Sequence, residues 1–334
     1  MQETTGSVVK WHGMLCNNIK FWYYIIHNED VFNMRTDMNL CAYEIHSLSI
    51  KNEQIKIKEL LAYGTNAFVY KVEYRDRSYI LKELFPEGLS EQRVIKRDST
   101  GAVLYRLRII DKFKWQRVKL QFLLSIYKNR LLQRNLAVND CVSQNVGLFR
   151  TNGTLYALYE NISGKDWSCY AGESLEELII RCSKIAEIVY RIHRTGWLVM
   201  DVKASNFVIN ATESEEHIQL VDFDSMVRLS FARKKSKFYC SSETAPPESL
   251  EGRGRDVGVN SDVYSLAAML FKKICGVSYN ECKTLSLLMP FIENWSKERQ
   301  SKFVNLLKMV LCPDITRRDI SAIEFSRKLL ELLR

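Results

Sequence analysis

Four polar residues between Asp201 and Asp222 constrain this chain of 334 residues more than any other feature. Asp201, Lys203 and Asn206 follow one another in a D-x-K-x-x-N spacing. The residues after them have the pattern of a short β-hairpin, which ends just before Asp222. One hairpin therefore gathers two carboxylates, a carboxamide and a lysine. Phosphoryl transfer from ATP uses such a set, because a carboxylate orients a hydroxyl group, oxygen atoms hold Mg²⁺ and a cation faces the moving phosphate.

The composition indicates a soluble globular protein. Hydrophobic residues make up 46% of the chain and charged residues 26%, as in ordinary folded domains. No apolar run approaches the roughly 18 residues needed to span a bilayer, and the first residues lack the layout of a signal peptide. The nine cysteines form no C-x-x-C pair, so we expect reduced thiols and a cytoplasmic location.

The formal net charge of +9 is concentrated in two places. One cluster runs over residues 106–134, and the other consists of Arg233, Lys234, Lys235 and Lys237. Such clusters are most often solvated surfaces, but they also attract anionic partners such as ATP, an acidic protein substrate or nucleic acid. No nucleic-acid-binding motif accompanies the charge, so no specific nucleic-acid partner is expected.

The first half of the chain has the alternation of β-strands. Gly64 and Arg75–Ser78 mark the turns between the first three strands, and Asn152-Gly153 marks a later type I′ hairpin. Apolar residues at three- and four-residue steps predict a long basic helix between these two groups. The expected elements are strands at 55–61, 69–74 and 79–84, a helix at 112–133, and a hairpin with strands at 146–150 and 155–160.

The second half has the pattern of helices. Ser174 and Glu177 form a capping box, and Gly196 is placed to end the helix in a left-handed conformation. The apolar stripe between them comprises Leu175, Leu178, Ile179, Cys182, Ile185, Ala186, Val189 and Ile192. The change of pattern predicts an α+β, two-lobed fold: an N-terminal extension at 1–50, a small antiparallel β lobe at 51–162 and a larger, mostly helical lobe at 163–334.

From residue 55 to the C-terminus the chain resembles the eukaryotic-type protein kinases. The resemblance implies that Asp201 orients the substrate hydroxyl and that Lys203 neutralises charge on the transferring phosphate. It also implies Asn206 and Asp222 as ligands of Mg²⁺, which accepts a few protein oxygens together with those of ATP. A lysine two residues after the catalytic aspartate is typical of kinases that act on serine or threonine.

The resemblance extends to the first lobe, where it implies an ATP site. Lys82 matches the lysine that holds the α- and β-phosphates. The glycine loop keeps only its middle glycine, because Ala62 and Ala67 replace the others. The residues expected to bind the nucleotide are Lys82, Leu61, Gly64, Val69, Glu160 and Ile162.

Three motifs of the second lobe match elements with structural roles in the family. Residues 245–248 resemble the A-P-E end of an activation segment, and residues 261–266 resemble a helix start whose aspartate, Asp262, braces the catalytic loop. Residues 313–319 supply Arg318 as the expected buried partner of Glu248, a pair that persists only with full hydrogen bonding.

The chain departs from the family pattern at several positions. Val199-Met200 precede Asp201, so the arginine that binds an activation-segment phosphate is missing, and activity is not expected to need phosphorylation there. Asp224 replaces the glycine of the D-F-G motif, and Ile80 replaces a small residue over the adenine. No glutamate lies between Glu91 and Glu160 to pair with Lys82; the substitutes considered are Gln116, Gln121 and Asp111.

Five polar residues of the family pattern are all present, and they favour an ATP- and Mg²⁺-dependent serine/threonine kinase with a protein substrate. They are Lys82, Asp201, Lys203, Asn206 and Asp222. The altered glycine loop and the missing glutamate leave a second hypothesis open, a pseudokinase that binds nucleotide or protein without catalysis. A small-molecule phosphotransferase is less favoured, since such enzymes lack the A-P-E segment. The identity of the substrate, the oligomeric state and the role of residues 1–50 stay open.

Overall fold

The computed structural model describes residues 47–50, 53–63, 66–98, 102–106, 108–211 and 216–334. The expected N-terminal extension lies outside the described residues except for Ser47–Ile50, which forms strand β1. Gly64, in the glycine loop, also lies outside them.

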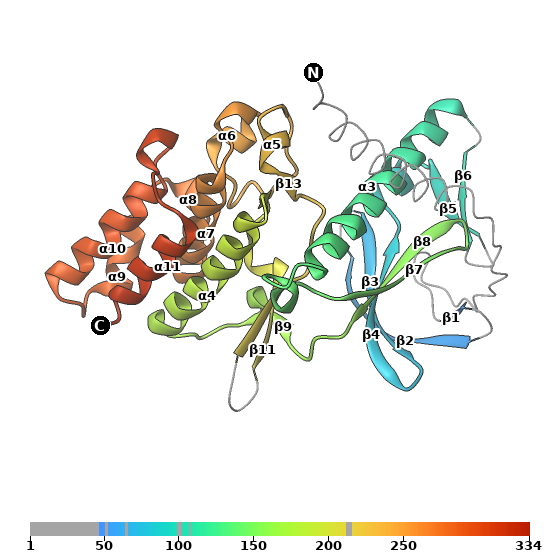
Figure 1. Cartoon of the computed structure of the whole chain (residues 1–334), viewed down its shortest axis with the longest axis horizontal. Helices are drawn as coiled ribbons and strands as arrows, with labels where there is room; N and C mark the ends of the chain where they lie inside the picture. Colours follow the sequence, from blue (N-terminus) through green and yellow to red (C-terminus); the bar gives the residue numbers. More distant parts are fainter. Residues whose placement is uncertain (1–46, 51–52, 64–65, 99–101, 107, 212–215) are drawn as a thin grey trace, which may run out of the picture.

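A six-stranded antiparallel sheet forms the smaller lobe, with the order β1-β2-β3-β4-β8-β7 (Figure 1). The predicted strands are present, and several are longer than the alternation indicated. Their bounds are Ser47–Ile50 (β1), Glu53–Tyr63 (β2), Ala67–Tyr74 (β3), Arg77–Leu84 (β4), Asn145–Thr151 (β7) and Thr154–Glu160 (β8). The apolar residues of this sheet form a core beneath helix α3, Ile109–Gln133, which begins three residues earlier than predicted.

Two tight turns fix the register of this sheet. Arg75 and Asp76 both have positive φ, 50° and 58°, so β3 and β4 are joined by a two-residue turn instead of the four-residue one expected. Asn152 and Gly153 have φ of 49° and 71°, which confirms the type I′ prediction between β7 and β8. The register that results places Lys82 opposite Val69 on one side and Ala157 on the other.

A small insertion between β4 and α3 was not predicted from the sequence. It consists of α2 (Glu87–Glu91) and a hairpin of β5 (Ile95–Arg97) and β6 (Val103–Tyr105). Arg97 attaches it to the sheet, because its Nη1 donates to Oε1 of the fully buried Glu83 at 2.8 Å. The hydroxyl groups of Tyr70 and Tyr156 also donate to Glu83, so this buried carboxylate has the hydrogen bonds it requires.

The larger lobe is built mainly from helices around α7, which is buried along most of its length (Figure 1). Helix α4 begins at the predicted capping box, and its predicted apolar stripe packs on α7 and α11. No helix within the described ranges is long and apolar enough to cross a membrane. The helices are α4 (Leu175–Arg194), α5 (Leu229–Ala232), α6 (Pro247–Leu250), α7 (Val259–Cys275), α8 (Tyr279–Cys282), α9 (Met289–Ile292), α10 (Lys297–Val310) and α11 (Ala322–Glu331).

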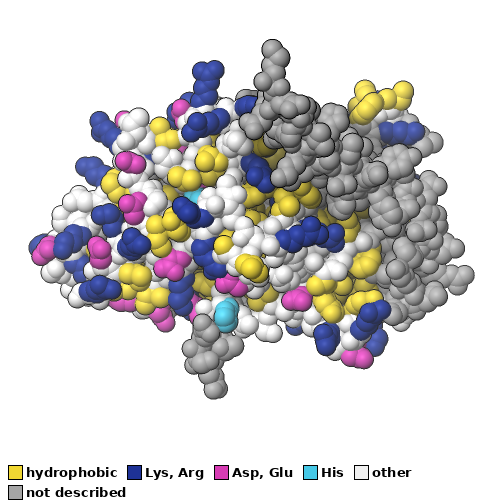
Figure 2. Space-filling model, viewed as in Figure 1, with side chains coloured by type: hydrophobic (Ala, Val, Ile, Leu, Met, Phe, Trp, Pro, Cys, Tyr) yellow, Lys and Arg dark blue, Asp and Glu magenta, His cyan; other side chains and the backbone are white. Residues whose placement is uncertain are grey.

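Short strands complete the larger lobe next to the smaller one. Strands β9 (Lys165–Asp166), β11 (Phe207–Ala211) and β12 (Glu216–Leu220) form one sheet, and β10 (Trp197–Leu198) pairs with β13 (Val227–Arg228). Lys and Arg side chains are interspersed with acidic ones over the visible helical lobe (Figure 2), an arrangement typical of a solvated surface. The predicted strands and helices are therefore present, and the α+β, two-lobed fold is confirmed.

The half-buried Lys119 of α3 gives an expected dependence of stability on pH. Its ammonium lies 4.9 Å from the centre of the Trp115 ring, where burial and then the charge of Arg150 lower the pKa of Lys119 to about 8. An unfolded lysine titrates near 10.4. Below pH 8 the buried charge therefore lowers the free energy of unfolding by its full amount. This destabilisation disappears as the pH rises from 8 to 10.5, because the folded state loses the charge first. Stability should therefore increase with pH in this window.

We expect Lys119→Met to raise the free energy of unfolding at pH 7 by roughly 1 kcal/mol, because one pKa unit corresponds to about 1.4 kcal/mol and residual solvent reduces the cost. The difference from the unmodified protein should shrink between pH 8 and 10.5. Urea denaturation at pH 7, 8, 9 and 10 measures it. The control is Lys112→Met, at an exposed lysine of the same helix. A difference that stays constant over this range contradicts the assignment.

Candidate active site

The loop between α4 and β11 brings together the polar residues singled out in the sequence. Gly196 ends α4 with a φ of 81°, as predicted, and lets the chain turn back into β10. The Lys203 ammonium then lies 2.7 Å from Oδ2 of Asp201. The Asn206 amide donates to the backbone carbonyl of Asp201 at 2.8 Å, which leaves its own side-chain oxygen available to another partner. The Val221 N–H donates to the Asn206 carbonyl, which brings Asp222 beside the loop.

The carboxylate of Asp262, on α7, stabilises the backbone of this loop, as expected. It accepts hydrogen bonds from the backbone N–H groups of Val199 and Met200, each at 2.8 Å. Nε2 of His193 lies 2.8 Å from the same carboxylate. Met200 has a φ of 68°, an uncommon conformation for a residue with a side chain. The hydrogen bonds of Asp262 therefore stabilise a strained backbone immediately before Asp201.

The segment after Asp222 packs against the other oxygen of Asp201. The Ser241 N–H donates to Oδ1 of Asp201 at 2.8 Å, and the Lys203 ammonium also donates to the Ser241 hydroxyl at 3.1 Å. Asp201 is only 8% exposed, and both of its oxygens have donors. This aspartate is therefore held in one orientation.

Lys82 reaches across from the smaller lobe to Asp222. Its ammonium lies 3.5 Å from Oδ1 of that aspartate. Burial opposes the charge of Lys82, but the carboxylates of Asp222 and Asp224 outweigh it and raise the pKa of Lys82 above its usual value. Burial likewise opposes ionisation of Asp222, and the Lys82 ammonium outweighs it to hold the pKa of that carboxyl below its usual range. Both groups are thus charged at neutral pH.

The other expected nucleotide-binding residues that the structure describes lie on β2, β3 and β8 or just after β8. Leu61, near the end of β2, is 46% exposed, while Val69 on β3 is partly buried next to Lys82. Glu160 ends β8, and its N–H donates to the Gln144 carbonyl. Ile162 is partly buried two residues later, and Gly64 lies outside the described residues. These placements are compatible with an ATP site between the lobes.

The substitutes considered for the missing glutamate partner of Lys82 are wrong. Gln121 donates instead to the hydroxyl of Tyr239 at 3.1 Å. Asp111 lies in the first turn of α3, where its nearest cation is Arg108 at 4.0 Å, and Gln116 is exposed. The partner of Lys82 is Asp222, which no helix periodicity could have identified.

Sequence reasoning also missed two residues of α3 that contact the segment 222–224. The Lys128 ammonium donates to the backbone carbonyls of Phe223 and Asp224 at 3.2 and 2.9 Å. The Ser125 hydroxyl lies near the Asp224 carboxylate and lowers its pKa, but desolvation and then the charge of Asp222 raise that pKa overall. The only signal in the sequence is the i, i+3 spacing of Ser125 and Lys128, which puts them on one helix face.

An apolar cluster takes the place of the missing arginine. The Met200 side chain, 2% exposed, packs with Leu198, Val227, Ala232 and Val257. The segment after Asp222 is therefore attached to the loop of Asp201 by apolar contacts as well as by Ser241.

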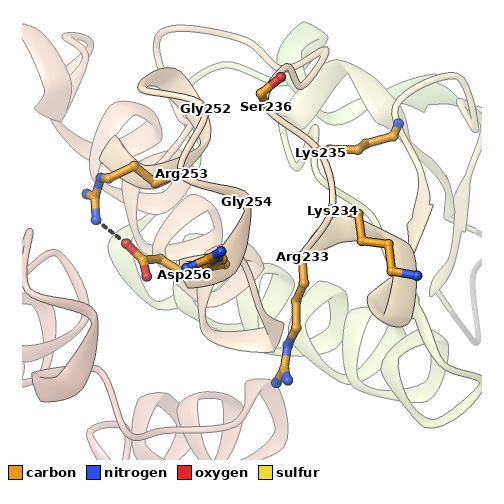
Figure 3. Close-up of a pocket in the computed structure, with 9 residues that line it drawn as sticks. Arg233, Lys234, Lys235, Ser236, Gly252, Arg253, Gly254 and Asp256 are labelled. Atoms are coloured by element: carbon orange, nitrogen blue, oxygen red, sulfur yellow. Dashed lines mark hydrogen bonds and ion pairs between the residues drawn. The ribbon is translucent and has the colours of Figure 1, made fainter.

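A cationic pocket of about 690 Å³ lies outside this polar cluster (Figure 3). Its lining residues are Arg233, Lys234, Lys235, Ser236, Gly252, Arg253, Gly254, Arg255 and Asp256. Arg253 is paired with Glu251 and Asp256, and Figure 3 shows Lys234 and Lys235 extending away from that pair. The two glycines permit close packing, since a Cβ at Gly254 would meet the Lys235 carbonyl oxygen at 2.0 Å. The excess of cations would attract an anionic group.

The donor atoms of the polar cluster suit Mg²⁺ bound together with phosphates. Asp222 supplies a carboxylate and Asn206 a carboxamide oxygen, both hard ligands. In the part of the chain that the structure describes, no group of three or more His, Cys, Asp or Glu residues is arranged to hold a metal by itself. A cation here would therefore share its coordination sphere with a bound ligand, as Mg²⁺ does with nucleotide phosphates.

Comparisons with known proteins show which family the chain resembles. The family profile of the protein kinase domain matches residues 117–327. Calcium-dependent protein kinase 31 of Arabidopsis thaliana is 27% identical over 124 residues, 37% of this chain and 24% of that protein. Citron rho-interacting kinase of Rattus norvegicus is 23% identical over 235 residues, 67% of this chain and 11% of that protein. The chain thus spans less than a quarter of the length of these two relatives.

Solved structures show the same fold at low sequence identity. The apo form of PpkA-294 superposes with a TM-score of 0.61 and 20% identity, covering 89% of this chain and 100% of that one. A double mutant of the PknI kinase domain of Mycobacterium tuberculosis gives a TM-score of 0.55 and 16% identity, covering 84% of this chain and 96% of that one. These matches cover 84–89% of the chain, whereas the family profile begins at residue 117, after Lys82.

Proposed function

The chain belongs to the protein kinase family, and we propose that it is an active kinase that transfers the γ-phosphate of ATP to serine or threonine hydroxyls of a protein substrate. The observation that carries the proposal is the ion pair of Lys82 with Asp222, 3.5 Å apart across the two lobes. It puts the proposed phosphate-binding lysine next to the proposed metal-binding aspartate. The catalytic loop of Asp201, Lys203 and Asn206 adjoins both.

The proposed mechanism assigns each residue one task. Asp201 accepts a hydrogen bond from the substrate hydroxyl, orients its oxygen toward the γ-phosphorus and takes up its proton as the new O–P bond forms. Lys203, already 2.7 Å from Asp201, neutralises charge on the transferring phosphoryl group. Lys82 binds the α- and β-phosphates. The ADP oxygen leaves as its bond to the γ-phosphorus breaks.

Asn206 and Asp222 are the proposed ligands of Mg²⁺. When bound, Mg²⁺ would neutralise charge on the phosphate oxygens. Leu61, Val69, Glu160 and Ile162 are proposed to enclose the adenine, with Gly64 in the loop above the phosphates. The backbone of 160–162 is proposed to meet the edge of the base. The side chains at 61 and 69 contribute apolar contact.

The alternative is a pseudokinase that binds nucleotide or a protein partner without catalysis. Ala62 and Ala67 in the glycine loop favour it, as does the lack of a carboxylate from α3 beside Lys82. Incubation of the full chain with γ-labelled ATP, Mg²⁺ and a peptide library separates the two. The library carries serine, threonine or tyrosine as its only acceptor.

The active-kinase proposal expects label on serine and threonine peptides and little on tyrosine peptides. Thermal unfolding with ATP and Mg²⁺ is measured in parallel, because a ligand of the native state raises its stability. A thermal shift without any transfer favours the pseudokinase. Absence of both contradicts the nucleotide site itself.

Activity is expected not to need phosphorylation of the segment between Asp222 and Glu248. Met200 offers no charge to a phosphate, and its apolar cluster already holds this segment. Treatment with a broad-specificity phosphatase should leave the initial rate within about twofold, since no charge-assisted pair is lost. A phosphate on Ser236, Ser241, Ser242 or Thr244 that raised the rate manyfold would show that another cation does the work of the missing arginine. Mass spectrometry before and after treatment gives the phosphorylation state.

A further inference from the structure

Helix α3 makes its contact with the active site through a cation instead of a carboxylate. Its only acidic residue is Asp111, in the first turn, beside Arg108. Lys82 is paired with Asp222 instead. The helix nevertheless reaches the metal-binding segment through Lys128, whose ammonium lies 2.9 Å from the Asp224 carbonyl oxygen and 3.2 Å from that of Phe223.

One of these contacts acts on the same peptide group that orients Asp222. The carbonyl of Phe223 and the N–H of Asp224 belong to a single planar peptide unit. Its carbonyl accepts from Lys128 at 3.2 Å, and its N–H donates to Oδ1 of Asp222 at 3.1 Å. Because the unit is rigid, fixing its oxygen also fixes the direction of its N–H. The position of the Asp222 carboxylate is thereby linked to Lys128.

Further hydrogen bonds fix the end of helix α3 next to this contact. One residue beyond Lys128, the fully buried Asn129 donates to the Ser143 carbonyl at 2.8 Å. The Ser143 N–H in turn donates to the Leu220 carbonyl at 2.9 Å, two residues before Asp222. Ser125, one turn before Lys128, lies near the Asp224 side chain. This end of α3 is therefore attached to the segment before Asp222 and to the segment after it.

We propose that Lys128 is a positioning residue for the metal site: it orients the 223–224 peptide, which presents the Asp222 carboxylate to Mg²⁺, and so couples α3 to nucleotide binding without a helix glutamate. The inference rests on the proposed function, in which Asp222 is a metal ligand. The coupling needs a donor at the end of a long side chain, because the helix and the carbonyls belong to different lobes. An arginine meets this requirement and a methionine does not.

The test compares Lys128→Met and Lys128→Arg with the unmodified full chain. The thermal shift is measured at saturating ATP while the Mg²⁺ concentration is increased, and the readout is the Mg²⁺ concentration that gives half of the maximal shift. This measurement requires no catalysis. Loss of a partner that orients a metal ligand typically weakens metal affinity 10- to 100-fold. We expect Lys128→Met to raise the half-maximal Mg²⁺ concentration about tenfold and Lys128→Arg to stay much nearer the unmodified protein.

Two further measurements separate positioning from general damage. The thermal shift with ATP and EDTA should be the same in Lys128→Met as in the unmodified chain. The control Lys112→Met replaces an exposed lysine on the first turn of α3. It should change neither the half-maximal Mg²⁺ concentration nor the Mg²⁺-free shift. An unchanged Mg²⁺ requirement in Lys128→Met overturns the inference, as does an equal loss of the Mg²⁺-free shift. If the unmodified chain shows the Mg²⁺-dependent shift but transfers no phosphate, the proposed activity fails while the role of Lys128 is still decided. No Mg²⁺-dependent shift in the unmodified chain overturns the role of Lys128, and label transfer still decides the proposed activity.

Discussion

Replacement of Asp201 by asparagine is expected to lower kcat by a factor of about 10² to 10⁴, the usual contribution of a positioned general base. Asparagine preserves the size of the side chain and can still accept from the Ser241 N–H, which now donates to Oδ1 of Asp201 at 2.8 Å. It cannot take up the substrate proton, and it loses the charge that faces Lys203 at 2.7 Å. The orientation of the loop should therefore survive, while the chemistry is lost.

The measurement is the initial rate of labelled phosphate transfer at saturating ATP and peptide. Asp256→Asn is the matched control, because it neutralises a carboxylate that pairs with the exposed Arg253. Its rate should equal that of the unmodified chain. The Mg²⁺-ATP thermal shift of Asp201→Asn should persist, which shows that the nucleotide site is intact. Equal rates for Asp201→Asn and the unmodified chain would remove Asp201 from the mechanism.

Breaking the buried pair of Glu248 and Arg318 is expected to cost 3–5 kcal/mol of stability, as for other buried pairs that lose one partner. The predicted pair is present, with two parallel hydrogen bonds of 2.6 and 2.9 Å, and both residues are fully buried. The Ser261 hydroxyl donates to Glu248 as well. Glu248→Leu leaves a guanidinium that cannot lose its proton, so the charge stays buried without a counter-charge.

Urea denaturation of three variants tests this expectation. Glu248→Leu and Arg318→Met should each be strongly destabilised, whereas the double variant should recover much of the loss, because it leaves no unpaired charge. Glu251→Leu is the control: its pair with Arg253 is exposed, and such pairs contribute about 0–1 kcal/mol. A double variant that loses the sum of the two single losses would show that the two residues act independently.

The sequence predicted the elements whose signals are local. The capping box at Ser174 and the left-handed Gly196 depend on hydrogen bonds and backbone angles within a few residues, so they were correct. The same holds for Asn152-Gly153. The bracing by Asp262 was also predicted, because the resemblance to the protein kinases implied it. The insertion with β5 and β6 was missed, since three-residue strands give too short an alternation to recognise.

The polar cluster at Asp201 and Asp222 was thus defined by the sequence alone, through a spacing that a single hairpin holds together. The partner of Lys82 and the role of Lys128 required the tertiary structure. Both lysines act on residues 222–224, more than 90 positions away along the chain. Whether their side chains reach that segment depends on how the lobes pack, because side chains that meet across lobes share no periodicity or turn signal.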